Sequence, residues 1–127
     1  MAFVDTNIVL RWILGDDKLL TPKAEKLVDV ARPGSLIITD VVVAEIVYVL
    51  RGTGRDRMQT VEALEFLMRT PSFTYENEEL TQDIMGLLGS TKLDYADCYL
   101  VARALRSGAG LATFDVAMRK KLDRLSV

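Results

Sequence analysis

The chain has 127 residues, of which 50% are hydrophobic and 27% are charged, which suits one globular domain spanning residues 1–127. It has a formal net charge of −2 and no histidine. These facts exclude Ser-His-Asp and Cys-His catalysis and ordinary zinc sites, and they argue against a protein that binds duplex DNA by charge alone. Hydrolysis by carboxylates, with or without a metal ion, remains open.

No apolar run approaches the roughly 20 residues that span a bilayer, and residues 1–9 lack the basic start and apolar stretch of a secretion signal. We therefore expect a cytoplasmic protein. Cys98 is the only cysteine, so it cannot form an internal disulfide. Its apolar surroundings in the sequence favour a small core residue over a reactive thiol.

The N-terminal part alternates apolar runs with helical patterns. Residues 2–5 predict a short strand that ends in Asp, and residues 6–14 carry apolar side chains at helical spacing. A second helix is expected at residues 21–31, with Pro22 just inside its start, where proline is favoured. Residues 35–38 then predict a second, buried strand.

The middle of the chain predicts two capped helices and a strand. Asp40 can cap a helix at residues 41–50, and Asp56 can cap another from about 57 to 69. Residues 71–75 are typical of a short third strand.

The C-terminal part predicts helices at residues 77–88 and 94–107, a fourth strand at 111–114 and a last helix at 116–122. The tail, residues 125–127, could add a fifth edge strand. Strands that alternate with helices imply right-handed crossovers and a mostly parallel sheet covered on both faces. We therefore predict an α/β fold with three α/β/α layers and a central sheet of four or five strands.

Two aspartates follow predicted strands. Asp5 ends the first strand and Asp115 follows the fourth. Because ligands of open parallel sheets gather at the carboxyl ends of the strands, both carboxylates are expected at that edge. Either residue could instead simply cap the helix that follows it.

Glu45 lies inside a predicted helix among apolar residues. Its neighbours one turn away are all apolar or aromatic: Val41, Val42, Tyr48 and Val49. We therefore expect Glu45 on the buried face of this helix. A carboxylate there must find a partner or stay protonated, because burying a bare charge costs several kcal/mol.

Asp97 follows Asp94 by three residues and has apolar neighbours at Leu93, Leu100 and Val101. If Asp94 is the N-cap of the helix, Asp97 falls at its third position, near the positive end of the helix dipole. Asp97 is then expected on the packed face. The two residues could also form no more than a capping pair.

Carboxylates without histidine suit a magnesium or manganese ion, since both prefer oxygen ligands. Such an ion can activate water and stabilise the departing oxygen of a phosphodiester. Asn7 and Thr113 lie two residues from Asp5 and Asp115 and could orient a ligand or a metal-bound water. An Asx turn and an ordinary strand residue are the alternatives for these two.

The segments D5-T-N7, E45, D94-Y-A-D97 and T113-F-D115 resemble the signature of PIN-domain ribonucleases, and specifically the small VapC-type toxins of type II toxin–antitoxin pairs. Their order and spacing extend across almost the whole chain. The short C-terminus departs from the family pattern and leaves its usual last strand in doubt.

The resemblance implies a catalytic, metal-binding set of Asp5, Glu45, Asp97 and Asp115, with polar support from Asn7, Asp94 and Thr113. It further implies Mg²⁺ or Mn²⁺ as cofactor, endonucleolytic cleavage of an RNA substrate, and a homodimer. It also implies a cognate antitoxin protein that inserts a segment into the site.

Two clusters of basic residues follow the helix of Glu45 and Asp115. Candidate contacts to RNA phosphates are Arg51, Arg55, Arg57, Arg119 and Lys120, and the second cluster continues with Lys121 and Arg124. These clusters could equally be solvated faces. Aromatic residues could stack on bases, although packing in a core or dimer is the preferred interpretation for Trp12, Tyr48, Tyr95 and Tyr99.

Two other functions compete with a ribonuclease. A magnesium-dependent phosphatase would use Asp5 as its nucleophile, but the sequence after Asp5 lacks the second Asp and the Thr of a D-x-D-x-T motif. A catalytically idle PIN-like module could instead dock a basic partner peptide on the acidic edge. Stabilisation by a divalent metal would distinguish an enzyme from this module.

Overall fold

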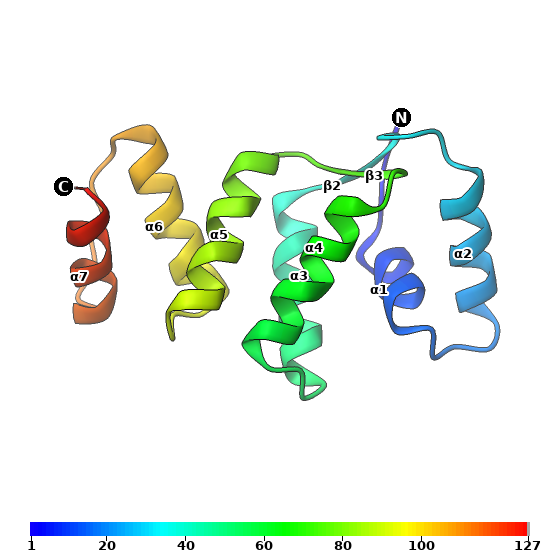
Figure 1. The fold of residues 1–127 in the computed structure, drawn as a ribbon, viewed down its shortest axis with the longest axis horizontal. Helices are drawn as coiled ribbons and strands as arrows, with labels where there is room; N and C mark the ends of the chain where they lie inside the picture. Colours follow the sequence, from blue (N-terminus) through cyan, green and yellow to red (C-terminus); the bar gives the residue numbers. More distant parts are fainter. Residues whose placement is uncertain (127) are drawn as a thin grey trace. The chain divides into compact units, whose positions relative to one another are not determined.

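The computed structural model describes residues 1–126, in which three strands and seven helices are found (Figure 1). The strands are β1 (Ala2–Phe3), β2 (Leu36–Ile38) and β3 (Phe73–Tyr75). The helices are α1 (Thr6–Leu14), α2 (Leu20–Val30), α3 (Asp40–Gly52), α4 (Arg57–Arg69), α5 (Glu78–Ser90), α6 (Tyr95–Ser107) and α7 (Val116–Leu125).

The chain divides into two compact units, residues 1–78 and the residues from Glu79 onward. The single domain expected from the length of the chain stays a prediction. Among the described residues, no helix combines the length and the apolar character that crossing a bilayer requires.

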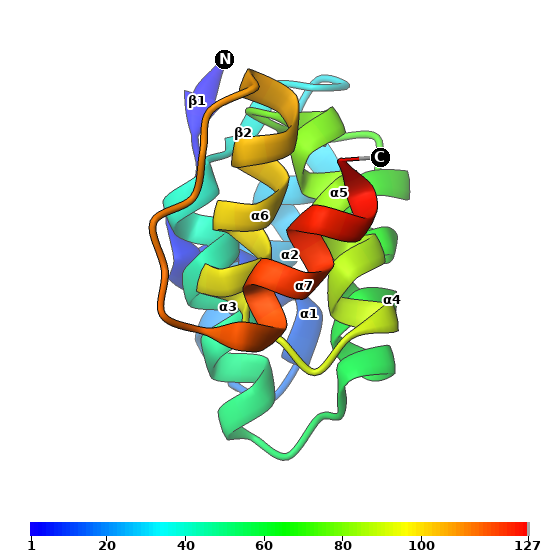
Figure 2. The same cartoon turned by 90° about the vertical axis from the view of Figure 1, so that its left-hand side faces the viewer.

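The first unit contains a parallel sheet in the order β1-β2-β3, with β1 at an edge beside β2 (Figure 2). Ala2 pairs with Leu36, and Leu36 pairs with Phe73. The carboxyl ends of parallel strands meet at one edge, so the residues that follow the three strands lie along that edge. The structure therefore confirms a parallel α/β arrangement, which is mostly helical.

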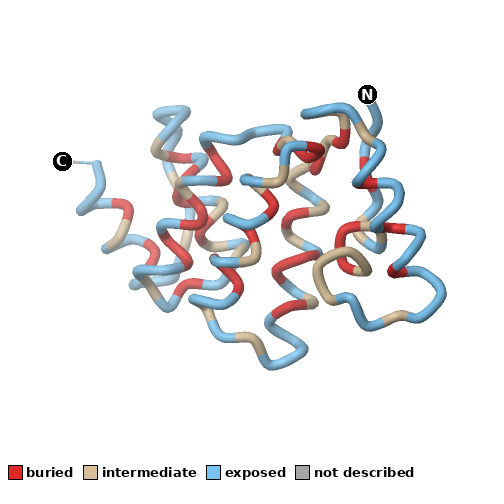
Figure 3. Tube along the Cα trace, turned by 45° about the vertical axis from the view of Figure 1, so that its right-hand side comes forward, coloured by how far each residue is buried: buried red, intermediate tan, exposed pale blue. Residues whose placement is uncertain are grey.

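Buried aliphatic side chains hold the helices of this unit together. Ile38, Val43, Ile46, Leu50 and Leu64 are fully buried, and buried positions recur among exposed ones along the helices (Figure 3). Such side chains each contribute roughly 1.5–3 kcal/mol when removed from water. A core built from β2, α3 and α4 follows from this pattern.

Aromatic side chains make a second cluster in the same unit. The Trp12 ring stacks on Phe66 at a centroid distance of 5.3 Å and meets Phe73 edge-on at 5.4 Å. Tyr75 donates its hydroxyl hydrogen to the Leu64 carbonyl at 2.7 Å. Trp12 is therefore a packing residue, as preferred from the sequence, whereas Tyr48 is 81% exposed and packs in no core.

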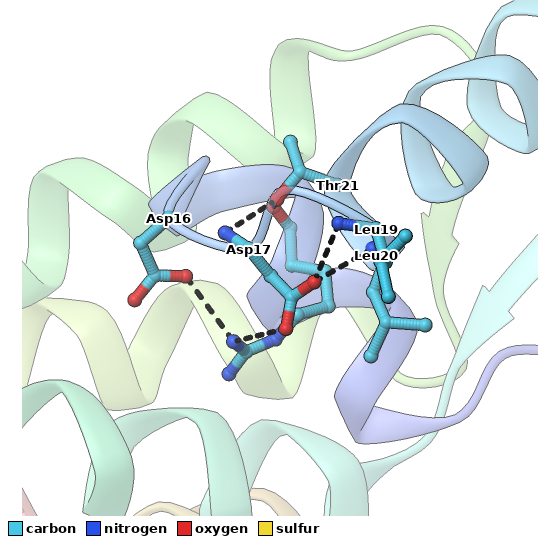
Figure 4. A network of polar contacts seen from close by, with 6 residues as sticks. Asp16, Asp17, Leu19, Leu20 and Thr21 are labelled. Atoms are coloured by element: carbon cyan, nitrogen blue, oxygen red, sulfur yellow. Dashed lines mark hydrogen bonds and ion pairs between the residues drawn. The ribbon is translucent and has the colours of Figure 1, made fainter.

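A polar network connects α1 to α2 (Figure 4). One Asp17 carboxylate oxygen accepts hydrogen bonds from the backbone N–H groups of Leu19 at 2.9 Å and Leu20 at 2.7 Å. These two bonds are the main cause of the lowered pKa of Asp17, to which Arg11 adds an attractive charge. Asp17 thus serves as the cap that α2 lacks at Leu19 itself.

Helix starts in the structure test the predicted caps. Asp56 caps α4, and its capping box with Gln59 confirms the prediction. Asp40 was expected to cap the third helix, but the cap is Thr39, whose side chain accepts the Val42 N–H at 3.3 Å. Asp40 is the first residue of α3, because Thr39 already supplies the acceptor one position earlier.

The four- or five-stranded sheet is not confirmed. Residues 111–114, expected to be a strand, form none in the described part of the chain. The Leu111 carbonyl instead accepts a hydrogen bond from the Arg119 side chain. The expected edge strand at 125–127 is also absent from its described part, since Leu125 ends α7, and Val127 lies outside the described residues.

The second unit consists of α5, α6 and α7, with α7 running beside α6 (Figure 2). Arg106 of α6 pairs with Asp83 and, at 3.0 Å, with Glu79 of α5. Met118 and Leu122 form the buried side of α7. Cys98 is fully buried, which confirms its prediction as a core residue.

Candidate metal and nucleic-acid site

Asp94 and Asp97 have different positions at the start of α6. Asp94 is the N-cap, and its Oδ1 accepts the backbone N–H of Asp97 at 2.9 Å. Asp94 is exposed, whereas Asp97, inside the first turn, is half-buried. The predicted cap is confirmed, and the Asp97 carboxylate stays available for another partner.

Asp115 is held in a similar way at the start of α7. Its Oδ1 accepts the Met118 N–H at 3.0 Å, and its own N–H is donated to the Thr113 hydroxyl at 3.0 Å. Thr113 therefore fixes the backbone of Asp115 and, through it, the direction of the carboxylate. This contact forms without a strand at residues 111–114, and the expected role of Thr113 in orienting a ligand or a metal-bound water stays a prediction.

Burial raises the pKa of the Asp97 carboxyl, and the negative charges of Asp94 and Asp115 raise it further. No basic side chain offsets this repulsion by direct pairing, because no ion pair to Asp97 is found among residues 1–126. A carboxylate crowded by two others gains most from a bound cation. The second unit thus brings together three of the predicted acidic residues, Asp94, Asp97 and Asp115.

Asp97 and Asp115 line one cavity of about 450 Å³. Its wall also carries four basic side chains: Lys92, Lys120, Lys121 and Arg124. Three of these four, Lys120, Lys121 and Arg124, belong to the basic cluster that the sequence offered as candidate phosphate contacts, and Lys92 does not. The spacing of Lys120, Lys121 and Arg124 places these three on one face of a helix, whereas no local pattern of the sequence points to Lys92.

Asp5 and Asn7 lie in the first unit, after β1. Asp5 is exposed and caps α1 by accepting the Asn7 N–H at 3.0 Å. The donor of this Asx-type bond is the backbone N–H of Asn7, and Asn7 is exposed. The alternative that Asp5 caps a helix is therefore realised, and one of its carboxylate oxygens keeps the capacity for further ligands.

Glu45 is not on the buried face of its helix, contrary to the prediction. The buried residues of α3 are Val43, Ile46, Val47 and Leu50, and Glu45 is exposed. Val41 and Tyr48, its neighbours one turn away, are 69% and 81% exposed. Because α3 is apolar on nearly every side, its sequence does not reveal which side packs.

A polar network that the sequence did not suggest lies at the carboxyl edge of the sheet. Glu76 follows β3, and its Oε1 accepts the Asp40 N–H at 3.1 Å. Asn77 donates from Nδ2 to Asp40 Oδ2 at 2.8 Å. The signal was present, because Glu76 directly follows β3, and Asp40 follows β2 after one intervening residue, as Asp5 follows β1.

The basic residues expected to contact RNA differ in their surroundings. Arg51, Arg55 and Arg57 belong to the first unit, where Arg55 donates to the Thr53 hydroxyl at 2.7 Å. Arg119 is engaged with the Leu111 carbonyl. Lys120, Lys121 and Arg124 of the second cluster line the cavity of Asp97 and Asp115.

The donor atoms at Asp97 and Asp115 suit a hard cation. Magnesium takes one or two carboxylates and keeps several waters, so two aspartates in a 450 Å³ cavity provide suitable ligands. Within residues 1–126, no three acidic, cysteine or histidine side chains are close enough together to hold an ion by themselves. An ion held here would therefore need water or substrate oxygens as its remaining ligands.

A model of the PIN-domain family matches residues 2–122, almost the whole chain. The chain belongs to the PIN-domain family. A search of curated proteins and a search of solved structures each found no match. PIN domains are generally nucleases that act on RNA or DNA, and they generally use divalent metal ions. Membership therefore supports a hydrolase that acts on nucleic acid. The carboxylate oxygens of Asp97 and Asp115, which suit a divalent metal ion, agree with this.

Proposed function

We propose that this PIN domain is a metal-dependent endoribonuclease in which Asp5, Glu45, Asp97 and Asp115 bind Mg²⁺ or Mn²⁺. The observation that carries the proposal is the pair Asp97 and Asp115 in one cavity, with a raised pKa at Asp97 and no ion pair to it among residues 1–126. Asp5 and the oxygen-rich edge after β1 support it, as does the family match over residues 2–122.

The bound ion would activate a water and stabilise the oxygen that leaves the phosphodiester. Asp97 and Asp115 would hold the ion directly. Asp94 keeps the first turn of α6 in place through the Asp97 N–H, and Thr113 does the same for Asp115. Asn7 shares a turn with Asp5 and would keep that carboxylate in a defined orientation.

We also propose that the protein is a VapC-type toxin that acts in the cytoplasm, forms a homodimer and is inhibited by a cognate antitoxin. This rests on the spacing of D5-T-N7, E45, D94-Y-A-D97 and T113-F-D115 along the chain. The three-layer fold with a sheet of four or five strands belongs to the same proposal.

The test is cleavage of single-stranded RNA by purified, antitoxin-free protein with Mg²⁺, with Mn²⁺ and with EDTA. We expect cleavage with either metal, none with EDTA, and none by Asp97→Asn or Asp115→Asn. Cleavage that persists in EDTA and in both variants would refute the mechanism. An inactive wild type that still binds a basic peptide would support the idle binding module.

A further inference from the structure

Helix α7 presents two different faces in the second unit. Met118 and Leu122 are buried, four residues apart on one side. The adjacent side carries Ala117, Lys120, Lys121 and Arg124, all of which line the cavity of Asp97 and Asp115. Positions three, four and seven residues apart lie on one face of a helix, so the three cations form a continuous basic wall.

The cations of this wall have no ion-pair partner in the part of the chain that the structure describes. Among residues 1–126, neither Lys92 nor the three cations of α7 form an ion pair, although Asp97 and Asp115 line the same cavity. Like charges four residues apart, such as Lys120 and Arg124, destabilise a helix by roughly 0.2–0.5 kcal/mol. The arrangement therefore costs stability and leaves the cations open to an external anion.

We propose that this basic wall, Lys120, Lys121 and Arg124 with Lys92 opposite, binds consecutive backbone phosphates of a single RNA strand beside Asp97 and Asp115. The identity of the strand as RNA rests on the proposed function. The position of the phosphates rests on the cavity alone.

The charges and size of the cavity select the ligand. Its four cations exceed its two carboxylates, so an anion is attracted, and a cavity of about 450 Å³ has the volume of a small-molecule pocket. A pocket of that size suits one or two nucleotides of a single strand. Lys120 and Arg124, one helical turn apart, can contact neighbouring phosphates, and the planar guanidinium of Arg124 can bind two oxygens of one phosphate.

The test measures binding of a fluorescein-labelled 12-nucleotide single-stranded RNA in EDTA, so that no cleavage takes place. The variant is Lys120→Gln/Lys121→Gln/Arg124→Gln, because glutamine supports a helix as well as lysine does. The control is Lys23→Gln/Lys26→Gln/Arg32→Gln, which removes three exposed, unpaired positive charges from the first unit. Net charge is thus the same in variant and control.

Each phosphate contact to single-stranded nucleic acid contributes roughly 0.7 to the slope of log affinity against log salt. We expect the slope of the α7 variant to fall by about 2, with affinity down about a hundred-fold at 0.1 M salt and equal to wild type near 1 M. The control is expected to keep the wild-type slope. Equal slopes in variant and control, or displacement of the RNA by poly-glutamate at equal charge concentration, would overturn the inference.

Cleavage assays on wild type and the α7 variant distinguish the phosphate site from the proposed nuclease activity. If wild type binds RNA through the α7 cations but never cuts it with Mn²⁺, the nuclease proposal fails and the phosphate site stands. If wild type cuts RNA and the α7 variant cuts it with an unchanged KM, the phosphate site fails and the nuclease stands. We expect the variant to raise KM more than it lowers kcat.

Discussion

Replacing Asp94 tests the division of labour between the two aspartates of α6. Asp94→Ala removes the acceptor of the 2.9 Å hydrogen bond from the Asp97 N–H. Loss of such a cap costs about 1 kcal/mol, which lowers the melting temperature of a chain of this length by about 4 °C. Asp94→Asn keeps the acceptor and removes the charge that raises the pKa of Asp97, so its stability is expected to stay close to that of wild type.

The assay is thermal unfolding followed by far-ultraviolet circular dichroism in EDTA, together with RNA cleavage in Mn²⁺. Asp123→Ala, at an exposed position of α7, serves as the control and is expected to change stability by less than about 0.5 kcal/mol. Asp94→Asn should weaken cleavage and Asp97→Asn should abolish it. Equal destabilisation by Asp94→Asn and Asp94→Ala would refute the capping role, and equal loss of cleavage by Asp94→Asn and Asp97→Asn would refute the division.

Three further predictions concern pH and metal. Because the pKa of Asp97 is raised, its favourable contribution to stability is present below pH 3.8, its pKa in the unfolded chain, and is lost as pH rises through its folded-state pKa. Asp97→Asn should therefore stabilise the metal-free protein at neutral pH and not at pH 3. The lowered pKa of Asp17 has the opposite sign, so Asp17→Ala should destabilise the protein at neutral pH and progressively less as pH falls below 3.8. Mn²⁺ at 100 times its dissociation constant should add about 2.7 kcal/mol to the stability of wild type and much less to that of Asp115→Asn.

Urea unfolding at several pH values measures the first two of these, and thermal unfolding with and without Mn²⁺ measures the third. Asp29→Asn, at an exposed position of α2, is the pH control. A metal-free Asp97→Asn less stable than wild type at pH 7 would contradict the repulsion among the three carboxylates. An Asp17→Ala whose stability deficit grows toward acid pH would contradict the capping of α2. An unchanged wild type in Mn²⁺ would remove the basis of the metal site.

Local chemistry made several features predictable from the sequence. Asp56, Asp94 and Asp115 each cap the helix that follows them, because an N-cap needs only a short side chain with an acceptor oxygen and the N–H two or three residues later. The same locality explains why α1, α4 and α6 begin within a residue or so of their predicted starts. Thr39 replaced Asp40 as a cap because two adjacent residues were both suitable acceptors.

Features that depend on long-range packing were not predictable in this way. Glu45 is surrounded by apolar residues in α3, and only the packing of Val43, Ile46 and Leu50 decided that Glu45 faces outward. Residues 111–114 have a strand-like sequence, but a strand needs a neighbouring strand, and the Leu111 carbonyl bonds to Arg119 instead.

The sequence by itself determined the acidic residues, the absence of histidine and the positions of the caps, since each depends on residue type and on neighbours a few positions away. Only the tertiary structure placed Asp97 and Asp115 in one cavity and turned Lys121 and Arg124 toward it. The physical reason is that α6 and α7 are joined by a loop whose course no local pattern defines. Burial and charge repulsion at Asp97 exist only after that loop has brought the two helices together.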